Sequence, residues 1–211
     1  MKSYLELLTV FVIQLFIIVD PLACIPIFLA ITSSRTKNER RIMARRSCFI
    51  AFIVLAFFVV AGNAILSYLG ITTSTVQICG GILLFIIALE FLRGKATTTE
   101  TSTLEEQLAE EKEDVSVTPL AIPLLAGPGA IATTFVFAGR ANDVLAYITL
   151  VAGSALVFCA VYFCLYWADD VARIFGTLGM KIITRIMGFI LAFIAVQYVV
   201  DGILKLFFHA P

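Results

Sequence analysis

The sequence predicts an all-α integral membrane protein with six transmembrane segments, arranged as two inverted three-helix repeats. Hydrophobic residues make up 61% of the 211 residues and charged residues only 14%. The mean hydropathy is +1.02, far above that of a soluble domain of this length. Six apolar segments follow one another along the chain, and proline and glycine interrupt the first and the fourth. A bilayer explains the composition, whereas the two interruptions need a separate explanation.

The first membrane repeat is predicted at residues 1–94, with spans at residues 5–31, 48–69 and 76–92. A single helix over residues 5–31 would be about 40 Å long, against a hydrocarbon core of about 30 Å. Asp20-Pro21 and Pro26 predict instead two half-helices around an extended turn, because proline lacks a backbone donor and disfavours a continuous helix. The basic stretch 33–46 is predicted to be a solvated loop that reports topology.

The second membrane repeat is predicted at residues 117–211, after a polar cytoplasmic linker at residues 95–116. Its spans are residues 117–139, 144–167 and 186–204, with a loop over residues 168–185. Residues 117–134 contain three prolines and two glycines, which no continuous helix tolerates. In lipid, irregular backbone persists only where protein buries it or where it lines a wet cavity. The fourth segment therefore predicts a binding site, as broken helices do in secondary transporters.

Two internal matches indicate a duplication. The segment T-P-L-A-I-P at residues 118–123 echoes D-P-L-A-C-I-P at residues 20–26, with one residue deleted. Residues 81–90 parallel residues 188–197, with four of ten positions identical. Since each half has three spans, the second half would enter the membrane with the opposite polarity to the first. Such inverted repeats are common in transporter folds.

The distribution of lysine and arginine predicts the orientation. The first, third and fifth loops carry 12 of the 15 basic residues. Cytoplasmic loops are enriched in basic residues, so these loops are expected to be cytoplasmic and both termini outside. Asp201 and Lys205, four residues apart, are expected to form a surface pair near the outer face.

Polar residues inside apolar segments are the candidate site residues. An ionised carboxylate at the depth of Asp20 is costly unless it is paired, so Asp20 is either a site residue or the cap of a half-helix that begins at Pro21. Glu90 is either functional or paired locally with Arg93. Gln197 is either a ligand or gate contact or a helix-helix hydrogen bond. The hydroxyls of Thr133 and Thr134 either contact substrate or satisfy freed carbonyls. The predicted substrate-binding residues are Asp20, Pro21, Pro26, Thr118, Pro119, Pro123, Gly127, Pro128, Gly129, Thr133 and Gln197, and the coupling candidates are Asp20 and Glu90.

The sequence does not favour an enzyme, a metal site or a nucleic-acid-binding protein. A zinc protease needs H-E-x-x-H, and the chain has one histidine. The five cysteines show no C-x-x-C spacing, and no phosphate-binding loop or dinucleotide fingerprint is present. The net charge of +0 gives no basic excess for nucleic acid. No catalytic residue, metal or cofactor is predicted.

Three stretches carry a family resemblance: D-P-L-A-C-I-P-I-F at residues 20–28, P-L-A-I-P-L-L-A-G-P-G-A-I-A-T at residues 119–133, and R-I-M-G-F-I-L at residues 185–191 with the later Gln197 and Asp201-Gly202. They resemble the MarC family of bacterial and archaeal inner-membrane proteins. The family usually has glycine at the position of Ala23 and often a polar residue at that of Cys24. The resemblance implies a six-span, multi-pass protein of the inner membrane. It also implies, from some relatives, transport of small neutral amino acids such as glycine and alanine.

We therefore expect a secondary transporter of small neutral solutes that works by alternating access at a midplane site between the broken helices. Free amides at half-helix N-termini suit a carboxylate, and freed carbonyls suit an ammonium group or a coupling ion, either a proton or sodium. The expected partners are a small-molecule substrate and the lipid bilayer. A channel and a membrane scaffold without transport activity are the alternatives. The substrate, the direction of transport, the coupling ion and self-association are left open, as is whether the broken segments cross the membrane fully or are re-entrant.

Overall fold

The computed structural model describes residues 2–93, 125–141 and 143–208, and all regular structure in these residues is helical. The longest stretch outside the described residues is 94–124. It contains the predicted linker 95–116 and the proline segment 118–123. The helices are α1 (Lys2–Val19), α2 (Pro21–Ile31), α3 (Lys37–Tyr68), α4 (Thr73–Arg93), α6 (Pro128–Ala138), α7 (Val144–Tyr166) and α8 (Ala168–Phe208).

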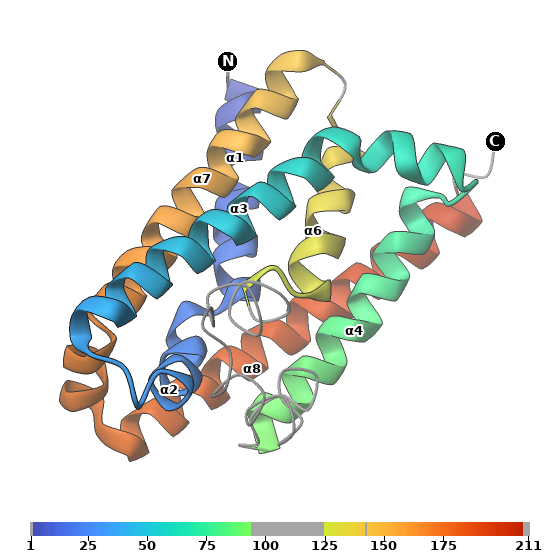
Figure 1. Ribbon diagram of the computed structural model, residues 1–211. Helices are drawn as coiled ribbons and strands as arrows, with labels where there is room; N and C mark the ends of the chain where they lie inside the picture. Colours follow the sequence, from blue (N-terminus) through green and yellow to red (C-terminus); the bar gives the residue numbers. More distant parts are fainter. Residues whose placement is uncertain (1, 94–124, 142, 209–211) are drawn as a thin grey trace.

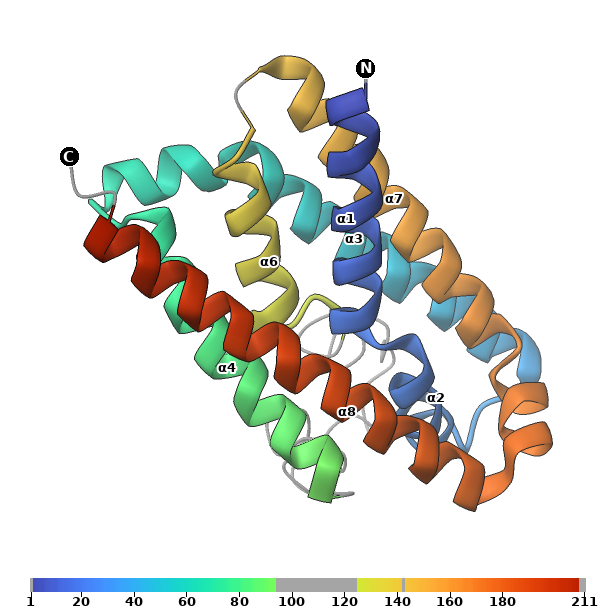
Figure 2. The same cartoon turned by 180° about the vertical axis from the view of Figure 1, so that it is seen from behind.

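Two pairs of long helices flank the short ones (Figure 1). α3 packs against α7 on one side, and α4 packs along α8 on the other. α1, α2 and α6 lie between the pairs, as the reverse view also shows (Figure 2). The buried side chains accordingly form two clusters, one built by α1, α3 and α7 together with α2 and α6, and the other by α4 and α8 together with single residues of α2 and α6. The short helices thus contact both flanking pairs.

Five helical segments are long and apolar enough to cross a membrane: Tyr4–Ile31, Lys37–Tyr68, Thr73–Arg93, Val144–Tyr166 and Leu178–Phe207. The first of these includes both α1 and α2. α6 is apolar but has only 11 residues, so it rises about 16 Å, half of the hydrocarbon thickness. The part of the predicted fourth span that precedes it lies largely outside the described residues. The chain is therefore an all-α multi-pass membrane protein, and a sixth crossing stays a prediction.

Two predicted loops are wrong, because both are largely helical. Most of the basic stretch 33–46 forms the first turns of α3, which begins at a capping box: the Thr36 amide donates to Glu39 Oε2 at 2.8 Å, and the Glu39 amide donates to Thr36 Oγ1 at 3.4 Å. Residues 168–185 belong to α8, which is kinked at Gly176 with φ 62° and ψ 179°. Hydropathy marks where a helix lies in lipid, and a helix that continues into water gives no hydropathy signal.

The first described helix begins, and the last one ends, on the same side of the molecule. The start of α1 and the end of α8 lie at one end of the bundle, and the basic first turns of α3 lie at the other end, beside the end of α2 (Figure 1). The start of α8 lies at that second end too (Figure 2). The side of the membrane on which the termini lie stays a prediction.

Candidate functional site at the two helix breaks

The first break is a single residue, Asp20, between α1 and α2. Its backbone has φ 42° and ψ 68°, and among the described residues it is the one non-glycine position with positive φ. Its side chain caps α2 by accepting a hydrogen bond from the Ala23 amide at 3.2 Å, and Pro21 occupies the start of the helix. The predicted extended turn is wrong, because Pro26 lies inside α2. One left-handed residue redirects the chain, so no longer turn is needed.

The Asp20 carboxyl group is buried at this break. The residue is 1% exposed, and its Oδ2 atom has no hydrogen-bond partner among the described residues. A buried polar atom without a partner costs about 1–3 kcal/mol. The positive end of the α2 dipole lies at the carboxyl group and offsets part of that cost. An oxygen in this position can take up a proton or contact a cation, the two coupling roles predicted for Asp20.

The second break lies at Gly127, immediately before α6. Gly127 has φ −69° and ψ 172°, and no side chain caps the helix; Pro128 occupies the start of the helix. The amides of Gly129 and Ala130, in the first turn, therefore have no side-chain acceptor at the N-cap and no intrahelical one. A Cβ at Gly129 would come within 2.4 Å of Leu84 Cδ2 on α4 and 3.3 Å of Ile18 Cγ2 on α1. The start of α6 thus lies against α4 and the end of α1, close to the first break.

Thr133 and Thr134 lie one turn further along α6 and are fully buried. The Thr134 hydroxyl donates to the Ala130 carbonyl at 2.8 Å. It therefore satisfies a backbone carbonyl of its own helix, which was the structural alternative to substrate contact. The Thr133 hydroxyl lies near the Tyr198 hydroxyl of α8 but makes no hydrogen bond of ordinary geometry among the described residues. Tyr198 instead donates to Gln14 Oε1 on α1 at 2.9 Å. Thr133 is the threonine that stays available for a ligand.

The two breaks lie 107 residues apart along the chain, and the same spacing relates several residues around them. Pro21 and Pro128 both begin a short helix of 11 residues. The same spacing relates Ala23 to Ala130 and Phe28 to Phe135, as well as the N-caps of α3 and α7, which are Thr36 and Asp143. The described counterpart of Asp20-Pro21 is therefore Gly127-Pro128, whereas the echo that the sequence offered, residues 118–123, lies outside the described residues.

Gln197 and Glu90 lie away from this centre. Gln197 is exposed, and its Nε2 donates to Asp201 Oδ1 at 2.6 Å. The predicted pair of Asp201 with Lys205 is wrong, because Lys205 Nζ donates to Gln77 Oε1 on α4 at 3.1 Å. Glu90 is half-buried one turn before the end of α4, on the side of the molecule where the basic first turns of α3 lie. Gln197 and Glu90 are counterparts at the 107-residue spacing, yet neither joins the buried groups at the breaks.

Three polar residues that the structure buries or brings near the site were not predicted from the sequence: Gln14, Gln77 and Tyr198. Gln77 is 1% exposed, with its Nε2 atom unpaired among the described residues. Tyr198 is 3% exposed, and Gln14 accepts its hydrogen bond. Each is a polar side chain within an apolar segment, which is the signal that could have found them. Of the predicted site residues, Thr118, Pro119 and Pro123 lie outside the described residues.

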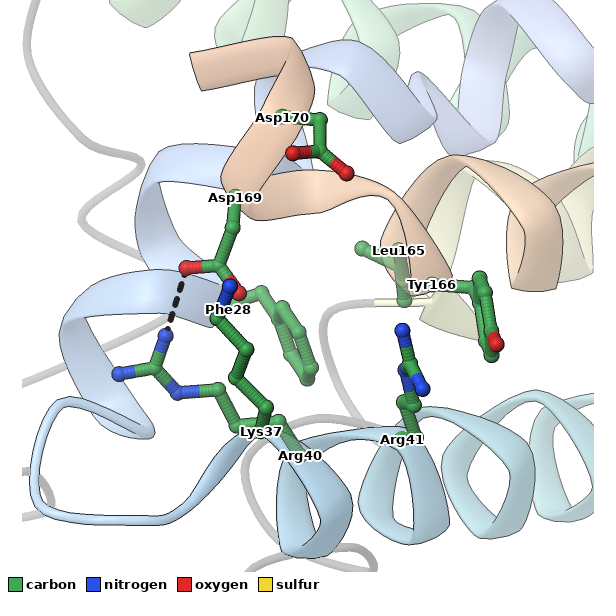
Figure 3. A pocket seen from close by; sticks show the side chains of 8 residues that line it. All are labelled: Phe28, Lys37, Arg40, Arg41, Leu165, Tyr166, Asp169 and Asp170. Carbon is green, nitrogen blue, oxygen red and sulfur yellow. Dashed lines mark hydrogen bonds and ion pairs between the residues drawn. The ribbon is translucent and has the colours of Figure 1, made fainter. Parts of the chain in front are cut away.

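A recess lies at the end of the molecule where α3 and α8 begin, between α3 and the junction of α7 with α8 (Figure 3). Arg40 Nη1 pairs with Asp169 Oδ1 at 2.8 Å, and its Nε donates to the Thr32 carbonyl at 2.9 Å. The guanidinium carbon of Arg41 lies 4.1 Å from the centre of the Tyr166 ring. The contacts of Arg40 with Asp169 and of Arg41 with Tyr166 join the first half of the chain to the second. Within the described residues, no group of three or more His, Cys, Asp or Glu side chains could hold a metal ion.

The chain is similar over its whole length to membrane proteins of bacteria and archaea. It is 34% identical to a UPF0056 membrane protein of Aquifex aeolicus, over 99% of this chain and 94% of that protein. It is 37% identical to a UPF0056 membrane protein of Archaeoglobus fulgidus, over 90% and 88%. It is 34% identical to the UPF0056 membrane protein YvbG of Bacillus subtilis, over 92% and 93%.

No solved structure gives a significant match to this chain. The family model described as "MarC family integral membrane protein" matches residues 5–207, which include both helix breaks and at least part of every described helix. The match over nearly the whole sequence, together with full-length relatives in bacteria and archaea, assigns the family. The chain therefore belongs to the MarC family of integral membrane proteins.

Proposed function

We propose that this chain is a secondary carrier of small neutral solutes, with small amino acids such as glycine and alanine as substrates. The observation that carries the proposal is that two half-helices, α2 and α6, both begin at a break between the two long helix pairs, with the start of α6 packed near Ile18 at the end of α1 (Figure 2). Each begins at a proline, and each break has a buried oxygen nearby without a hydrogen-bond partner among the described residues: Asp20 Oδ2 at the first and Thr133 Oγ1 after the second. Discontinuous helices inside a bundle form the usual site of secondary transporters.

The chemistry of the two breaks is complementary to a zwitterion. The uncapped first turn of α6 offers backbone amides and the positive end of a helix dipole, which suit a carboxylate. Asp20 offers a carboxylate oxygen, which suits an ammonium group, a proton or sodium. The close approach of Leu84 to Gly129 leaves little room beside α6, which favours a small side chain. Glycine and alanine fit both requirements.

The repeated spacing supports two inverted repeats. A Cβ at Gly81 would lie 2.7 Å from the Ala195 carbonyl oxygen, and a Cβ at Gly188 would lie 3.2 Å from the Ala88 carbonyl oxygen. Gly188 and Ala195 follow Gly81 and Ala88 by 107 residues each, so each half makes the same contact with the other. A reciprocal contact of this kind is what a two-fold relation produces. Inverted repeats let one half rock against the other, which is the basis of alternating access.

Polar contacts at different levels of the bundle suit a carrier that opens to one side at a time. At the end that the basic residues assign to the cytoplasm, Arg40 and Asp169 join the two halves. Near the breaks, Tyr198 and Gln14 join α8 to α1. Each contact can be exchanged for contacts with water at modest cost, because hydrogen bonds and half-exposed ion pairs contribute little net stability. Opening either end therefore does not require the core to unfold.

Uptake and counterflow of a solute panel by purified protein in liposomes test the function. Saturable uptake of glycine or alanine, with faster entry when the liposomes are preloaded with the same solute, is the expected result. Flux without acceleration by preloading would favour the channel. Absence of flux for every solute would favour the scaffold.

A further inference from the structure

We propose that Gln77 and Lys205 form a second binding site, a capture site for a carboxylate group near the end of the molecule where α8 finishes. It rests on the proposed function, because the carboxylate is that of the transported solute on its way to the helix breaks. Gln77 lies on α4 and Lys205 on α8, so the site is built from equivalent helices of the two halves.

The hydrogen bond between the two residues fixes the orientation of the amide. Lys205 Nζ donates to Gln77 Oε1 at 3.1 Å. An ammonium group has donors and no acceptor, so the oxygen of Gln77 must face Lys205 and the NH₂ group must lie on the other branch of the amide. That nitrogen, in a residue 1% exposed, has no acceptor among the described residues. The donors that Gln77 and Lys205 offer to a ligand are therefore the Gln77 NH₂ group and the remaining N–H bonds of Lys205.

The charges around the site also favour an anion. Among the described residues, Arg140, in the turn after α6, and Asp201, one turn before Lys205, are the charged groups that act on Lys205 electrostatically. Both also act on Tyr198, which lies beside Thr133. These described groups, two cations and one carboxylate, sum to one positive charge. The polar residues thus continue from the end of α8 toward the second helix break.

Close packing holds the two helices in place at this level. A Cβ at Gly202 of α8 would lie 2.6 Å from Ile78 Cγ1 and 3.0 Å from the Ser74 carbonyl oxygen of α4. A Cβ at Gly139, after α6, would lie 2.1 Å from Thr73 Cγ2. The backbone of α8 and the turn after α6 therefore both pack closely against α4 in the turn around Gln77. A preformed set of donors in such a packed position loses little freedom when it binds an acceptor.

The first test uses the wild-type protein with acetate as the carboxylate probe and acetamide as its uncharged control. Purified protein is acylated with an amine-reactive reagent, and labelling of each lysine is measured by mass spectrometry at constant ionic strength. Acetate is expected to slow labelling of Lys205 while acetamide does not, and neither should change labelling of the exposed Lys181 on the same helix. Equal labelling of Lys205 with acetate and with acetamide would overturn the proposal.

The second test measures glycine uptake by variants. Lys205→Gln and Gln77→Leu should each raise KM about tenfold with a smaller change in kcat, since each removes a charge-assisted or buried hydrogen bond to the carboxylate. Lys205→Arg should restore most of the affinity, and Lys181→Gln is the matched control. If the wild type takes up glycine and both variants keep the wild-type KM, the capture site is refuted and the proposed carrier function is not. No uptake by the wild type, together with protection of Lys205 by acetate, would refute the carrier and leave the binding site.

Discussion

Gly81 of α4 lies directly against the backbone of Ala195 of α8, where a Cβ would meet the Ala195 carbonyl oxygen at 2.7 Å. The reciprocal contact joins Gly188 of α8 to Ala88 of α4. Small residues that let two backbones approach are a common device of helix packing in membranes, where no hydrophobic effect drives the helices together. Close steric packing at these glycines therefore stabilises the α4–α8 pair, and substituting the glycines tests this.

Gly81→Ala should destabilise the protein by about 1–3 kcal/mol, because the new methyl group meets backbone, which cannot change rotamer. Gly188→Ala should do the same. The measurement is the melting temperature in detergent. Gly179→Ala on α8 is the control, because a Cβ there meets only Phe175, at 3.1 Å, from the preceding turn. Equal losses in all three variants would contradict the interpretation that backbone contact across α4 and α8 decides the effect.

Gly129→Ala should reduce transport more than expression, because its Cβ would meet Leu84 Cδ2 at 2.4 Å beside the second break. Gly127→Ala should be milder, since φ −69° and ψ 172° are open to alanine. Leu84→Ala combined with Gly129→Ala should recover part of the activity by removing the clash. Initial rates of glycine uptake, normalised to folded protein, decide the outcome. Failure of the double variant to exceed Gly129→Ala would exclude a steric cause.

Asp20→Asn should keep the protein folded and able to exchange solute, and should abolish uphill accumulation. Asparagine has nearly the size of aspartate, caps helices about as well and tolerates the left-handed conformation. It cannot carry a proton or a negative charge at physiological pH. The comparison is between counterflow and gradient-driven uptake, with Asp20→Ala as the variant that also loses the cap. Normal uphill uptake by Asp20→Asn would leave Asp20 as a structural cap alone.

Both termini should lie outside the cytoplasm. The reason is the excess of lysine and arginine in the predicted first, third and fifth loops, since the starts of α3 and α8 lie at one end of the molecule, opposite the start of α1 and the end of α8. A reporter that is active only outside the cytoplasm should be active when it is fused after residue 211. The same reporter inserted at residue 35, next to the basic start of α3, should be inactive. The reverse pattern would invert the topology.

Acidification should weaken the start of α7. The hydrogen bond from the Tyr4 hydroxyl, and then that from the Ala146 amide, hold the pKa of Asp143 below its usual range. A carboxyl group with a lowered pKa stabilises the folded protein above its unfolded pKa of about 4 and loses that contribution as the pH falls through the folded value. Wild-type melting temperatures should therefore fall more between about pH 5 and about pH 3 than those of Asp143→Asn.

The control for that prediction is Asp170→Asn, at an exposed position near the start of α8. It should follow the wild-type curve, because it leaves Asp143 and its partners intact. An acid-induced loss of the same size in Asp143→Asn and in the wild type would show that the contact between Tyr4 and Asp143 contributes nothing to the pH dependence.

The fold was predictable from the sequence where one rule dominates. The apolar segments at residues 48–69, 76–92 and 144–167 coincide with parts of α3, α4 and α7, because only helices satisfy their backbone within lipid. The helical ends outside the apolar core, at the start of α3 and the start of α8, were missed. Their polar residues are typical of loops. Whether such a polar segment is helical depends on helix capping and not on hydropathy.

The candidate site was predictable only in part. Asp20, Gly129 and Thr133 are recognisable as a charge, a helix breaker and a hydroxyl within apolar sequence, and the structure buries Asp20 and Thr133 and packs Gly129 closely against α1 and α4. Gln197 has the same kind of signal but is exposed, whereas the neighbouring Tyr198 faces inward. Hydropathy does not tell which side of an apolar helix faces lipid and which faces protein, since both sides carry apolar residues.

The sequence by itself determined that this is a membrane protein, where the apolar parts of its helices lie and that proline and glycine interrupt two of its segments, because those properties follow from local composition and backbone chemistry. Only the tertiary structure decided which groups meet. The pairing of Lys205 with Gln77 in place of Asp201, and the reciprocal contacts of Gly81 with Ala195 and of Gly188 with Ala88, depend on how distant helices cross. Such crossings are set by steric fit between backbones far apart in the chain, and no local pattern encodes that fit.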